Sequence, residues 1–532
     1  MSNRPEYDVI IIGGGITGAG TARDCAMRGL KVLLLERFDY THGATGRNHG
    51  LLHSGARYAV SDRESARECI QENTILRRIA SGCVEDTSGL FVELEGDDPD
   101  YAEHLMEGCA ASGIPARMMS AQEAMALEPS VNPRLRRAVQ VPDGAVDPFR
   151  LTMANLLDAR SHGAVVRNYE QVTDYVWESG RIAGVITMPR YGSRNEYHAR
   201  IVVNASGIWG QKMAQLAGVN VSMYPAKGAL LIFGHRVNNV VLNRCRKPSD
   251  ADILVPGDTI SLLGTTSSRV DYDTIDHMEV TPEEVDCLLD GGSQLVPELS
   301  DARILRAYCG VRPLVAADND PTGRGISRGI VLLDHSVRDH LEGLITITGG
   351  KLMTYRLMAE KATDLVMEKL GLSVPCRTHL EALPGSRPYD KDGRDAVTQS
   401  RYGEISRRIG AMNRVDRSLL CECEHVSQGE VRFALDELDV QNLVSLRRRT
   451  RLGMGTCQGG LCACRASSMM ADAGKISSTE AKDDLRDFLR ERWKGIRPIA
   501  WGQSLRECQY FLWMYRGLAG LDELDSDRDL NA

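Results

Sequence analysis

The 532-residue chain has no long hydrophobic run. No uninterrupted apolar stretch approaches the ~20 residues that a membrane-spanning helix needs. The first apolar strand begins within a few residues of Met1, so we expect no cleavable signal peptide. Internal repeats and low-complexity blocks are also missing. If the protein works at a membrane, we expect another component to hold it there.

The chain also lacks an excess of positive charge. Its 64 Lys and Arg residues are outnumbered by 72 Asp and Glu residues, which gives a net charge of −8. This balance argues against nucleic acid as the principal ligand. Apolar residues make up 42% and charged residues 26% of the sequence, which is typical of a globular protein. The length indicates two or three domains.

Cysteine, by contrast, is abundant, with fourteen residues. In a chain without an export signal, cysteines are better interpreted as thiols and metal ligands than as a disulfide framework. Nine have no mutual ligand spacing and are expected to be small buried side chains. The other five gather near the carboxyl end, in Cys421-Glu422-Cys423, Cys457-Gln458-Gly459-Gly460-Leu461-Cys462 and Cys464.

The two close cysteine pairs can converge on one centre. Four thiolates suit either a structural zinc ion or an iron–sulfur cluster. The spacing C-x-C and then C-x4-C differs from the C-x2-C pairs of zinc ribbons, which only partly decides the matter. With the intervening segment 447–456, the pattern resembles the bacterioferritin-associated-ferredoxin type of 2Fe-2S domain.

That resemblance implies a 2Fe-2S cluster, and zinc or an empty site is the alternative. The ligands are expected to be Cys421, Cys423, Cys457 and Cys462, with Cys464 as a spare thiol that could replace Cys462. The arginine run that begins at Arg447 favours a solvated helix face, with a docking patch for a redox partner as the second interpretation.

The amino end carries a dinucleotide-binding pattern. Asp8–Ile12 predicts a buried parallel strand, and the sequence Gly13-Gly14-Gly15-Ile16-Thr17-Gly18 follows it at once. Gly13 permits the tight turn, Gly15 lets the backbone approach a pyrophosphate, and Gly18 lets the next helix pack on the strand.

The segment after this turn completes the pattern. The helix is expected to run to about Arg28, and a second strand, Lys31–Leu35, ends at Glu36. The Glu36 carboxylate falls at the spacing of an acceptor for a ribose hydroxyl. We therefore predict cofactor contacts from Ile12, Gly13, Gly14, Gly15, Ile16, Thr17, Gly18, Glu36 and Arg37.

Two later strands also end in glycine-bearing turns. The strand Ile201–Val203 leads into Asn204–Trp209, and Leu344–Thr348 leads into Gly349, Gly350 and Lys351. Both fit a ligand that lies along the carboxyl ends of a parallel sheet. Gly207, Gly349 and Gly350 are therefore added to the predicted cofactor-binding residues.

Taken in order, these segments carry a family resemblance. The turn 13–18, Glu36 and the segments 50–58, 204–207, 308–314 and 349–356 resemble the FAD-dependent glycerol-3-phosphate dehydrogenases. The resemblance covers nearly the whole chain, including segments 243–259 and 492–502, and the cysteine segment narrows it to the anaerobic members. It implies an α/β fold in which a split Rossmann-type FAD-binding domain is interleaved with an antiparallel-sheet substrate domain.

The same resemblance implies an activity and partners. Members oxidise sn-glycerol 3-phosphate to dihydroxyacetone phosphate by hydride transfer to FAD. The anaerobic members pass electrons to menaquinone through partners, which implies a second catalytic chain and a membrane-anchoring iron–sulfur chain. The resemblance also implies a peripheral position on the cytoplasmic face of the inner membrane. An amino-acid or amine oxidase of the same fold, or a non-catalytic flavin and iron–sulfur electron-transfer chain, are the alternatives.

The chemistry of the reaction indicates candidate substrate residues. Oxidising a secondary alcohol needs a hydride acceptor, a base for the hydroxyl proton and fixed cations for the phosphate. Arg312 and Lys351 are the predicted catalytic cations, and Arg57 and Tyr58 join them in binding the substrate. Each cation could instead form a surface ion pair.

The chain departs from the family pattern at the proton acceptor. Aerobic members of the family carry a histidine shortly after the Lys-Gly that opens a substrate-domain strand, whereas this chain has Leu230 there. His53 is therefore assigned a provisional catalytic role, with His49 as a second candidate.

Composition suggests the domain boundaries. The FAD-dependent oxidoreductase should occupy residues 1–380, with FAD segments near 1–85, 145–225 and 325–375 and substrate segments between them. Residues 381–414 are polar and rich in turn formers and are expected to be a linker. A 2Fe-2S domain over 415–470 and a helical tail over 471–532 complete the prediction.

Overall fold

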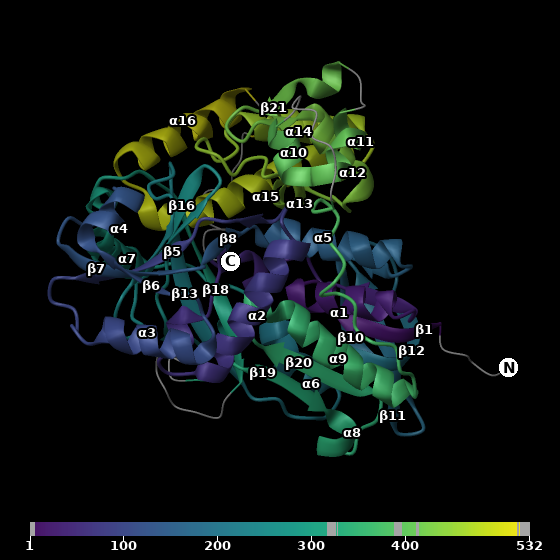
Figure 1. Ribbon diagram of the computed structural model, residues 1–532. Coiled ribbons are helices and arrows are strands. Elements are labelled where there is room, and N and C mark those ends of the chain that lie inside the picture. Colours follow the sequence, from purple (N-terminus) through teal and green to yellow (C-terminus); the bar gives the residue numbers. More distant parts are fainter. Residues whose placement is uncertain are drawn as a thin grey trace.

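The computed structural model describes residues 6–315, 326, 328–387, 396–410, 414–518 and 521. Two large β-sheets of eight and nine strands organise the chain. Groups of strands from the two sheets alternate along the sequence, so the two sheets are interleaved. The helices of the carboxyl-terminal part lie over both sheets (Figure 1). The α/β architecture predicted from the sequence is confirmed.

The first sheet has a parallel centre. Its strands are β1 (Tyr7–Ile12), β2 (Val32–Leu35), β9 (Val165–Arg167), β10 (Glu170–Glu178), β11 (Arg181–Pro189), β12 (Asn195–Asn204), β19 (Ile330–Asp334) and β20 (Leu344–Gly349). The parallel order is β20-β12-β1-β2-β9, extended by antiparallel β11, β10 and β19. Ile12 pairs with both Leu35 and Asn204, so the parallel strands end at one common edge.

Both faces of the parallel centre of this sheet are buried. Successive side chains of a strand point to opposite faces. Val9 and Ile11 pack with helices α1 (Ile16–Met27), α5 (Pro148–Ser161) and α9 (Tyr355–Leu370). Ile10 and Ile12 pack with the β10–β11 pair. Burial on both sides explains why the sequence of β1 is an unbroken apolar run rather than an alternation of apolar and polar residues.

The second sheet is mixed, in the order β17-β13-β16-β15-β14-β5-β7-β6, with β18 beside β13. Its strands are β5 (Gly89–Leu94), β6 (Arg117–Ser120), β7 (Leu135–Val141), β13 (Met223–Phe233), β14 (Val241–Arg244), β15 (Ile253–Gly257), β16 (Ile260–Gly264), β17 (Ser268–Arg269) and β18 (Ile304–Val315). Ala229 and Leu231 of β13 pack with helices α4 (Ala121–Leu127) and α7 (Pro282–Leu295). Leu230, between them, therefore faces the other side of the sheet.

Smaller elements complete this part of the molecule. Strand β8 pairs with both β3 and β4 in a three-stranded sheet. The strands are β3 (Leu51–Leu52), β4 (Val84–Glu85) and β8 (Gly144–Val146), and the remaining helices are α2 (Arg63–Ile79), α3 (Tyr101–Ser112), α6 (Gly210–Leu216) and α8 (His335–Arg338).

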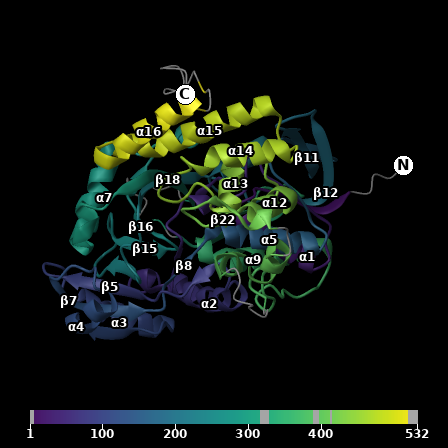
Figure 2. The same cartoon turned by 90° about the horizontal axis from the view of Figure 1, so that it is seen from above.

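The carboxyl-terminal part is mostly helical. It contains α10 (Ala396–Tyr402), α11 (Ser406–Gly410), β21 (Leu419–Cys421), β22 (Val426–Ser427), α12 (Gln428–Glu437), α13 (Leu443–Thr450), α14 (Cys462–Asp472), α15 (Ser478–Ile496) and α16 (Gly502–Leu518). Figure 2 shows α15 and α16 side by side, and the Arg492 guanidinium lies 5.0 Å from the centre of the Phe511 ring. None of the helices in the described ranges is both long enough and apolar enough to cross a membrane.

The predicted linker, 381–414, contains packed helices in its described part. Tyr402 of α10 and Ile409 of α11 belong to the same buried cluster as the side chains of α12 and α13. Residues 388–395 and 411–413 lie outside the described residues. The predicted boundary therefore falls in a segment that contributes to the core.

The arginine run in α13 is not a solvated helix face, so that interpretation was wrong. Arg449 is only 4% exposed and donates to the Asp39 carboxylate at 2.5 Å, and Arg448 donates to the same group at 3.0 Å. Burial raises the pKa of Asp39, but the charges of Arg449 and Arg448 outweigh burial and lower it. Local pattern could not indicate this pairing, because Asp39 and Arg449 are 410 residues apart in sequence.

Replacing Asp39 with asparagine should destabilise the protein by about 3–5 kcal/mol, because it leaves buried guanidinium groups without a counter-charge. Thermal unfolding of the variant and the wild type measures the loss. The matched control is Asp483→Asn, because Asp483 pairs with Arg486 at 3.0 Å on the exposed side of α15. The control should change stability by less than about 0.5 kcal/mol. Equal losses in the two variants would contradict the importance of the buried pair.

Candidate functional site

The carboxyl edge of the parallel strands faces β13 and β18 across a cavity of about 420 Å³. We call it the strand-edge cavity. Its volume is in the range of small-molecule sites, and its place at the strand ends is where such folds bind ligands. Fifteen predicted site residues line it, namely Ile12, Gly13, Gly15, Ile16, Thr17, Glu36, Arg37, His53, Arg57, Tyr58, Gly207, Arg312, Gly349, Gly350 and Lys351. Gly14 and Gly18, also predicted, lie behind this lining.

The glycine turn is built on close backbone contacts. Gly13 has φ +116°, and a Cβ there would lie 2.6 Å from the carbonyl oxygen of Ala205. A Cβ on Gly18 would lie 1.9 Å from the carbonyl oxygen of Gly13, so α1 packs directly on the turn. The backbone of Gly13 and Gly15 and the amino end of α1 thus face the cavity. This arrangement suits a pyrophosphate group.

Glu36 fixes the loop after β2 against this turn. Its carboxylate accepts from the N–H of Gly14 at 2.7 Å and from the N–H of Phe38 at 2.8 Å. Burial raises the pKa of Glu36, and the two N–H groups act in the opposite direction. The carboxylate also lines the cavity, so its contact with a ribose stays a prediction.

Cationic side chains gather at the other end of the cavity. Arg312 of β18 donates to the hydroxyl of Thr265 at 2.6 Å and to that of Ser267 at 3.0 Å, which fixes the guanidinium. Lys351 lies 4.7 Å from the centre of the Tyr58 ring. These cations suit a phosphate, which arginine binds in a bidentate manner.

Arg57 contributes a guanidinium that is only partly neutralised. It donates to Asp252 at 3.2 Å, while its Nη1 atom is buried with no hydrogen-bond partner among the described residues. Burial lowers the pKa of Arg57. A buried donor without a partner is costly, so this nitrogen is suited to receive a ligand oxygen.

Arg328 and Thr45, which were not predicted from the sequence, also line the cavity. Thr45 accepts from the N–H of Ile16 at 3.1 Å at the start of α1. Arg328 lies just before β19, and the nearby N–H of Gly350 donates to the carbonyl of Gly329 at 3.0 Å. No motif marks Arg328. Only the pairing of β19 with β20 brings it to the cavity.

His53 and His49 lie next to these cations, with ring centres 6.0 Å apart. Burial lowers the pKa of His53 well below its usual range, and the charges of His49, Arg57, Arg328 and Lys351 lower it further. The pKa of His49 falls to about 3 for similar reasons. Both rings are therefore neutral near pH 7, and a neutral imidazole can accept a proton. Leu230 lines the same cavity without an ionisable group.

Two histidines that line the strand-edge cavity, His42 and His49, should make the protein less stable in acid. The folded pKa is about 2 for His42 and about 3 for His49, against roughly 6.5 in an unfolded chain. Below about pH 6.5 the unfolded state binds more protons than the folded state. Each histidine therefore lowers the free energy of unfolding by up to about 1.4 kcal/mol for every pH unit of acidification. Thermal midpoints between pH 7.5 and 5.5 should show this decline, and His49→Asn should flatten it. His235→Asn, at a half-exposed residue, is the control, and an unchanged slope in His49→Asn would refute the assignment.

The four predicted cysteine ligands form two contacting pairs, Cys421 with Cys462 and Cys423 with Cys457. A hydrogen bond from Cys462 lowers the pKa of Cys421 to about 6. Burial raises the pKa of Cys457, which is also hydrogen-bonded to Cys423. Cys464 instead contacts the Tyr515 hydroxyl. Within the described ranges, no three His, Cys, Asp or Glu side chains are close enough together to hold a metal ion.

Comparison with known proteins adds to this geometry. Residues 8–356 match the family model described as FAD dependent oxidoreductase. The A subunit of anaerobic glycerol-3-phosphate dehydrogenase from Escherichia coli (strain K12) is 56% identical, over 98% of this chain and 98% of that protein. The A1 subunit of the enzyme of the same name from Haloferax volcanii is 44% identical, over 98% of this chain and 93% of that protein.

A solved structure shares the fold. The glycerol-3-phosphate dehydrogenase from Bacillus halodurans, complexed with FAD, aligns with a TM-score of 0.71. The alignment covers 94% of this chain and 97% of that chain at 22% sequence identity. The similarity extends beyond the two sheets into the carboxyl-terminal part.

Proposed function

Because this chain belongs to the FAD-dependent oxidoreductase family and, within it, to the A subunits of anaerobic glycerol-3-phosphate dehydrogenases, we propose that it is the catalytic subunit of such an enzyme. It oxidises sn-glycerol 3-phosphate to dihydroxyacetone phosphate. The observation that carries this proposal is the meeting of a glycine turn and a cluster of cations in one cavity at the strand edge. An amino-acid oxidase needs no such cluster for a phosphate.

The glycine turn is suited to hold FAD, which supplies the acceptor for the hydride from C2 of the substrate. The backbone of Gly13 and Gly15 would hold the pyrophosphate, and Glu36 would lie near the ribose. Gly207, Gly349 and Gly350 complete the wall along the strand ends. The turn itself is tightly packed at Gly13, because a Cβ there would collide with the backbone of Ala205.

The cations hold the substrate and His53 takes its proton. Arg57, Arg312 and Lys351 bind the phosphate oxygens, and Tyr58 packs beside Lys351. The neutral His53 ring accepts the proton of the C2 hydroxyl as the hydride leaves C2. This division keeps the phosphate at the cationic end and leaves the alcohol to face the proton acceptor.

An anaerobic visible spectrum tests the proposal. Adding sn-glycerol 3-phosphate to the purified protein should bleach the flavin bands, and an artificial electron acceptor should restore them. Glycine, the control for an amine oxidase, should leave the spectrum unchanged. Flavin bands that ignore sn-glycerol 3-phosphate would favour a non-catalytic electron-transfer role instead.

The cysteine quartet is proposed to hold a 2Fe-2S cluster that takes electrons onward to partner subunits and, through them, to menaquinone at the cytoplasmic face of the inner membrane. The donor chemistry supports it, because Cys421, Cys423, Cys457 and Cys462 offer thiols only. Iron and acid-labile sulfide should disappear in Cys457→Ser and persist in Cys464→Ser, whose thiol contacts Tyr515. Zinc without sulfide would overturn the cluster.

A further inference from the structure

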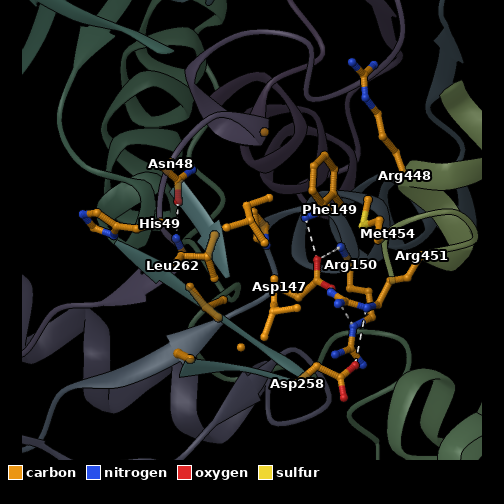
Figure 3. A pocket seen from close by; sticks show the side chains of 18 of the residues that line it. Asn48, His49, Asp147, Phe149, Arg150, Asp258, Leu262, Arg448, Arg451 and Met454 are labelled. Atoms are coloured by element: carbon orange, nitrogen blue, oxygen red, sulfur yellow. Dashed lines mark hydrogen bonds and ion pairs between the residues drawn. The ribbon is translucent and has the colours of Figure 1, made fainter. Parts of the chain in front are cut away.

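A second cavity, of about 950 Å³, lies where the carboxyl-terminal part meets the rest of the chain. We call it the interdomain cavity. Phe149, Leu262 and Met454 are among its apolar lining residues (Figure 3). Arg47, Asn48 and His49 line both this cavity and the strand-edge cavity, so one loop separates the two. The glycine turn, Glu36, Arg312 and Lys351 do not line it, so the proposed function leaves this space without a ligand.

One group of charges in the interdomain cavity is balanced. Arg150 pairs with Asp147 at 3.2 Å, and Arg451 lies 3.4 Å from Asp258 and 2.8 Å from Glu424. Figure 3 shows Asp147, Arg150, Arg451 and Asp258 together, with Arg448 apart from them. Acidic and basic groups alternate here and need no added ion.

A second group of charges in the same cavity is not balanced. Arg47, Arg306, Arg447 and Lys494 line it, and within the described ranges none of them has a carboxylate oxygen within the 4.0 Å of an ion pair. Arg306 donates to the backbone carbonyl of Glu491 at 3.3 Å, and Arg447 donates to the side-chain carbonyl of Gln458 at 3.5 Å. The Nε atoms of both arginines are buried without a partner in the described part of the chain.

The electrostatic balance of this second group is unfavourable. Burial lowers the pKa of Arg447 well below its usual range, and the nearby charges of Arg306 and Arg448 lower it further. Glu491 acts in the opposite direction, but it brings one negative charge to several cations, and Arg448 already pairs with Asp39. Partly buried cations that lack counter-charges and hydrogen-bond acceptors cost free energy, and an anion recovers it.

We propose that the interdomain cavity binds a small, multiply charged oxyanion, a phosphate monoester or a polycarboxylate, between Arg47, Arg306, Arg447 and Lys494. Arginine forks match both kinds of oxyanion, and a cluster of cations favours more than one negative charge. The apolar lining leaves room for a carbon skeleton beside the charged groups. None of these four residues is among those proposed to bind the substrate, so the site stands whether or not the proposed function holds.

The test measures thermal midpoints of the FAD-loaded full chain at low ionic strength. Citrate and inorganic phosphate are titrated separately, with sodium chloride at matched ionic strength as the reference. The midpoint should rise in a saturable manner with at least one of them. A response to citrate alone identifies a polycarboxylate site, and a response to phosphate identifies a phosphate site.

Variants locate the bound anion. Arg447→Gln should weaken the apparent affinity at least tenfold, and without anion it should unfold no earlier than the wild type, because it removes repulsion. If Arg447→Gln fails to fold, Lys494→Gln is used to measure the same loss of apparent affinity. Arg490→Gln is the control, because the Arg490 side chain is 48% exposed and pairs with Asp487 at 3.1 Å on the surface of α15, and this variant should respond like the wild type.

Three results would overturn the site. The first is a thermal midpoint of the wild type that shows no saturable rise with either citrate or inorganic phosphate. The second is an unchanged response in both Arg447→Gln and Lys494→Gln. The third is loss of the response in Arg312→Gln, which would place the anion in the strand-edge cavity instead.

Discussion

Arg312→Ala should lower kcat/KM for sn-glycerol 3-phosphate by about 10³-fold. The guanidinium is held by Thr265 and Ser267 before substrate arrives, so it meets the phosphate in a fixed orientation. Two charge-assisted hydrogen bonds are worth about 3–6 kcal/mol, and each 1.36 kcal/mol is about a tenfold change in rate. Steady-state kinetics with the FAD-loaded protein measure the effect.

Two further variants separate charge from geometry. Arg312→Lys keeps the charge but loses the planar fork, so it should recover only part of the activity. Arg269→Gln is the matched control on strand β17, which lies across β13 from β18, and its guanidinium lies over the Tyr224 ring at 5.0 Å. A full loss in the control, or wild-type kinetics in Arg312→Ala, would exclude Arg312 from phosphate binding.

Gly18→Ala should yield a protein with little or no bound FAD. The new Cβ would lie 1.9 Å from the carbonyl oxygen of Gly13, so α1 has to move off the turn that receives the pyrophosphate. The amount of FAD per chain, from the visible absorbance after gel filtration, measures the loss. A variant with full FAD content and an unchanged thermal midpoint would show that the turn tolerates the shift.

The control for this variant is Gly517→Ala. Gly517 lies in α16, and a Cβ there would have no heavy atom within 4 Å. Alanine favours a helix over glycine by about 1 kcal/mol. FAD content should stay at the wild-type level and stability should hold or rise slightly. The comparison isolates the collision at Gly18 from the general effect of replacing a glycine in a helix.

Local sequence pattern was enough to predict the amino-terminal unit. The strand predicted over Asp8–Ile12 is observed over Tyr7–Ile12, and the helix predicted to end near Arg28 ends at Met27. Both depend on neighbours in sequence: a buried apolar run, a glycine turn and a glycine stop. The residues of this unit that line the cavity could then be predicted as well, because parallel strands end at a shared edge where ligands bind.

Features that depend on distant pairing were not predictable. Arg328 reaches the strand-edge cavity only because β19 pairs with β20, and no pattern around it signals a ligand contact. The arginine run of α13 has the composition of a solvated surface. Arg449 is nevertheless buried, where it pairs with the carboxylate of Asp39 near the amino end of the chain. The composition of a segment indicates which environments it can occupy, but the residues that it pairs with determine whether it is buried.

The pairing of Asp39 with Arg449 also has a consequence for biosynthesis. A ribosome that adds about 5–20 residues per second needs roughly 20–80 s to reach Arg449 after Asp39 has emerged. During that interval the nascent nucleotide-binding unit carries an acid whose counter-charge has not been made. The amino-terminal half is thus expected to complete its packing only after translation has passed α13, and shortened chains that stop before that helix should need chaperones or aggregate.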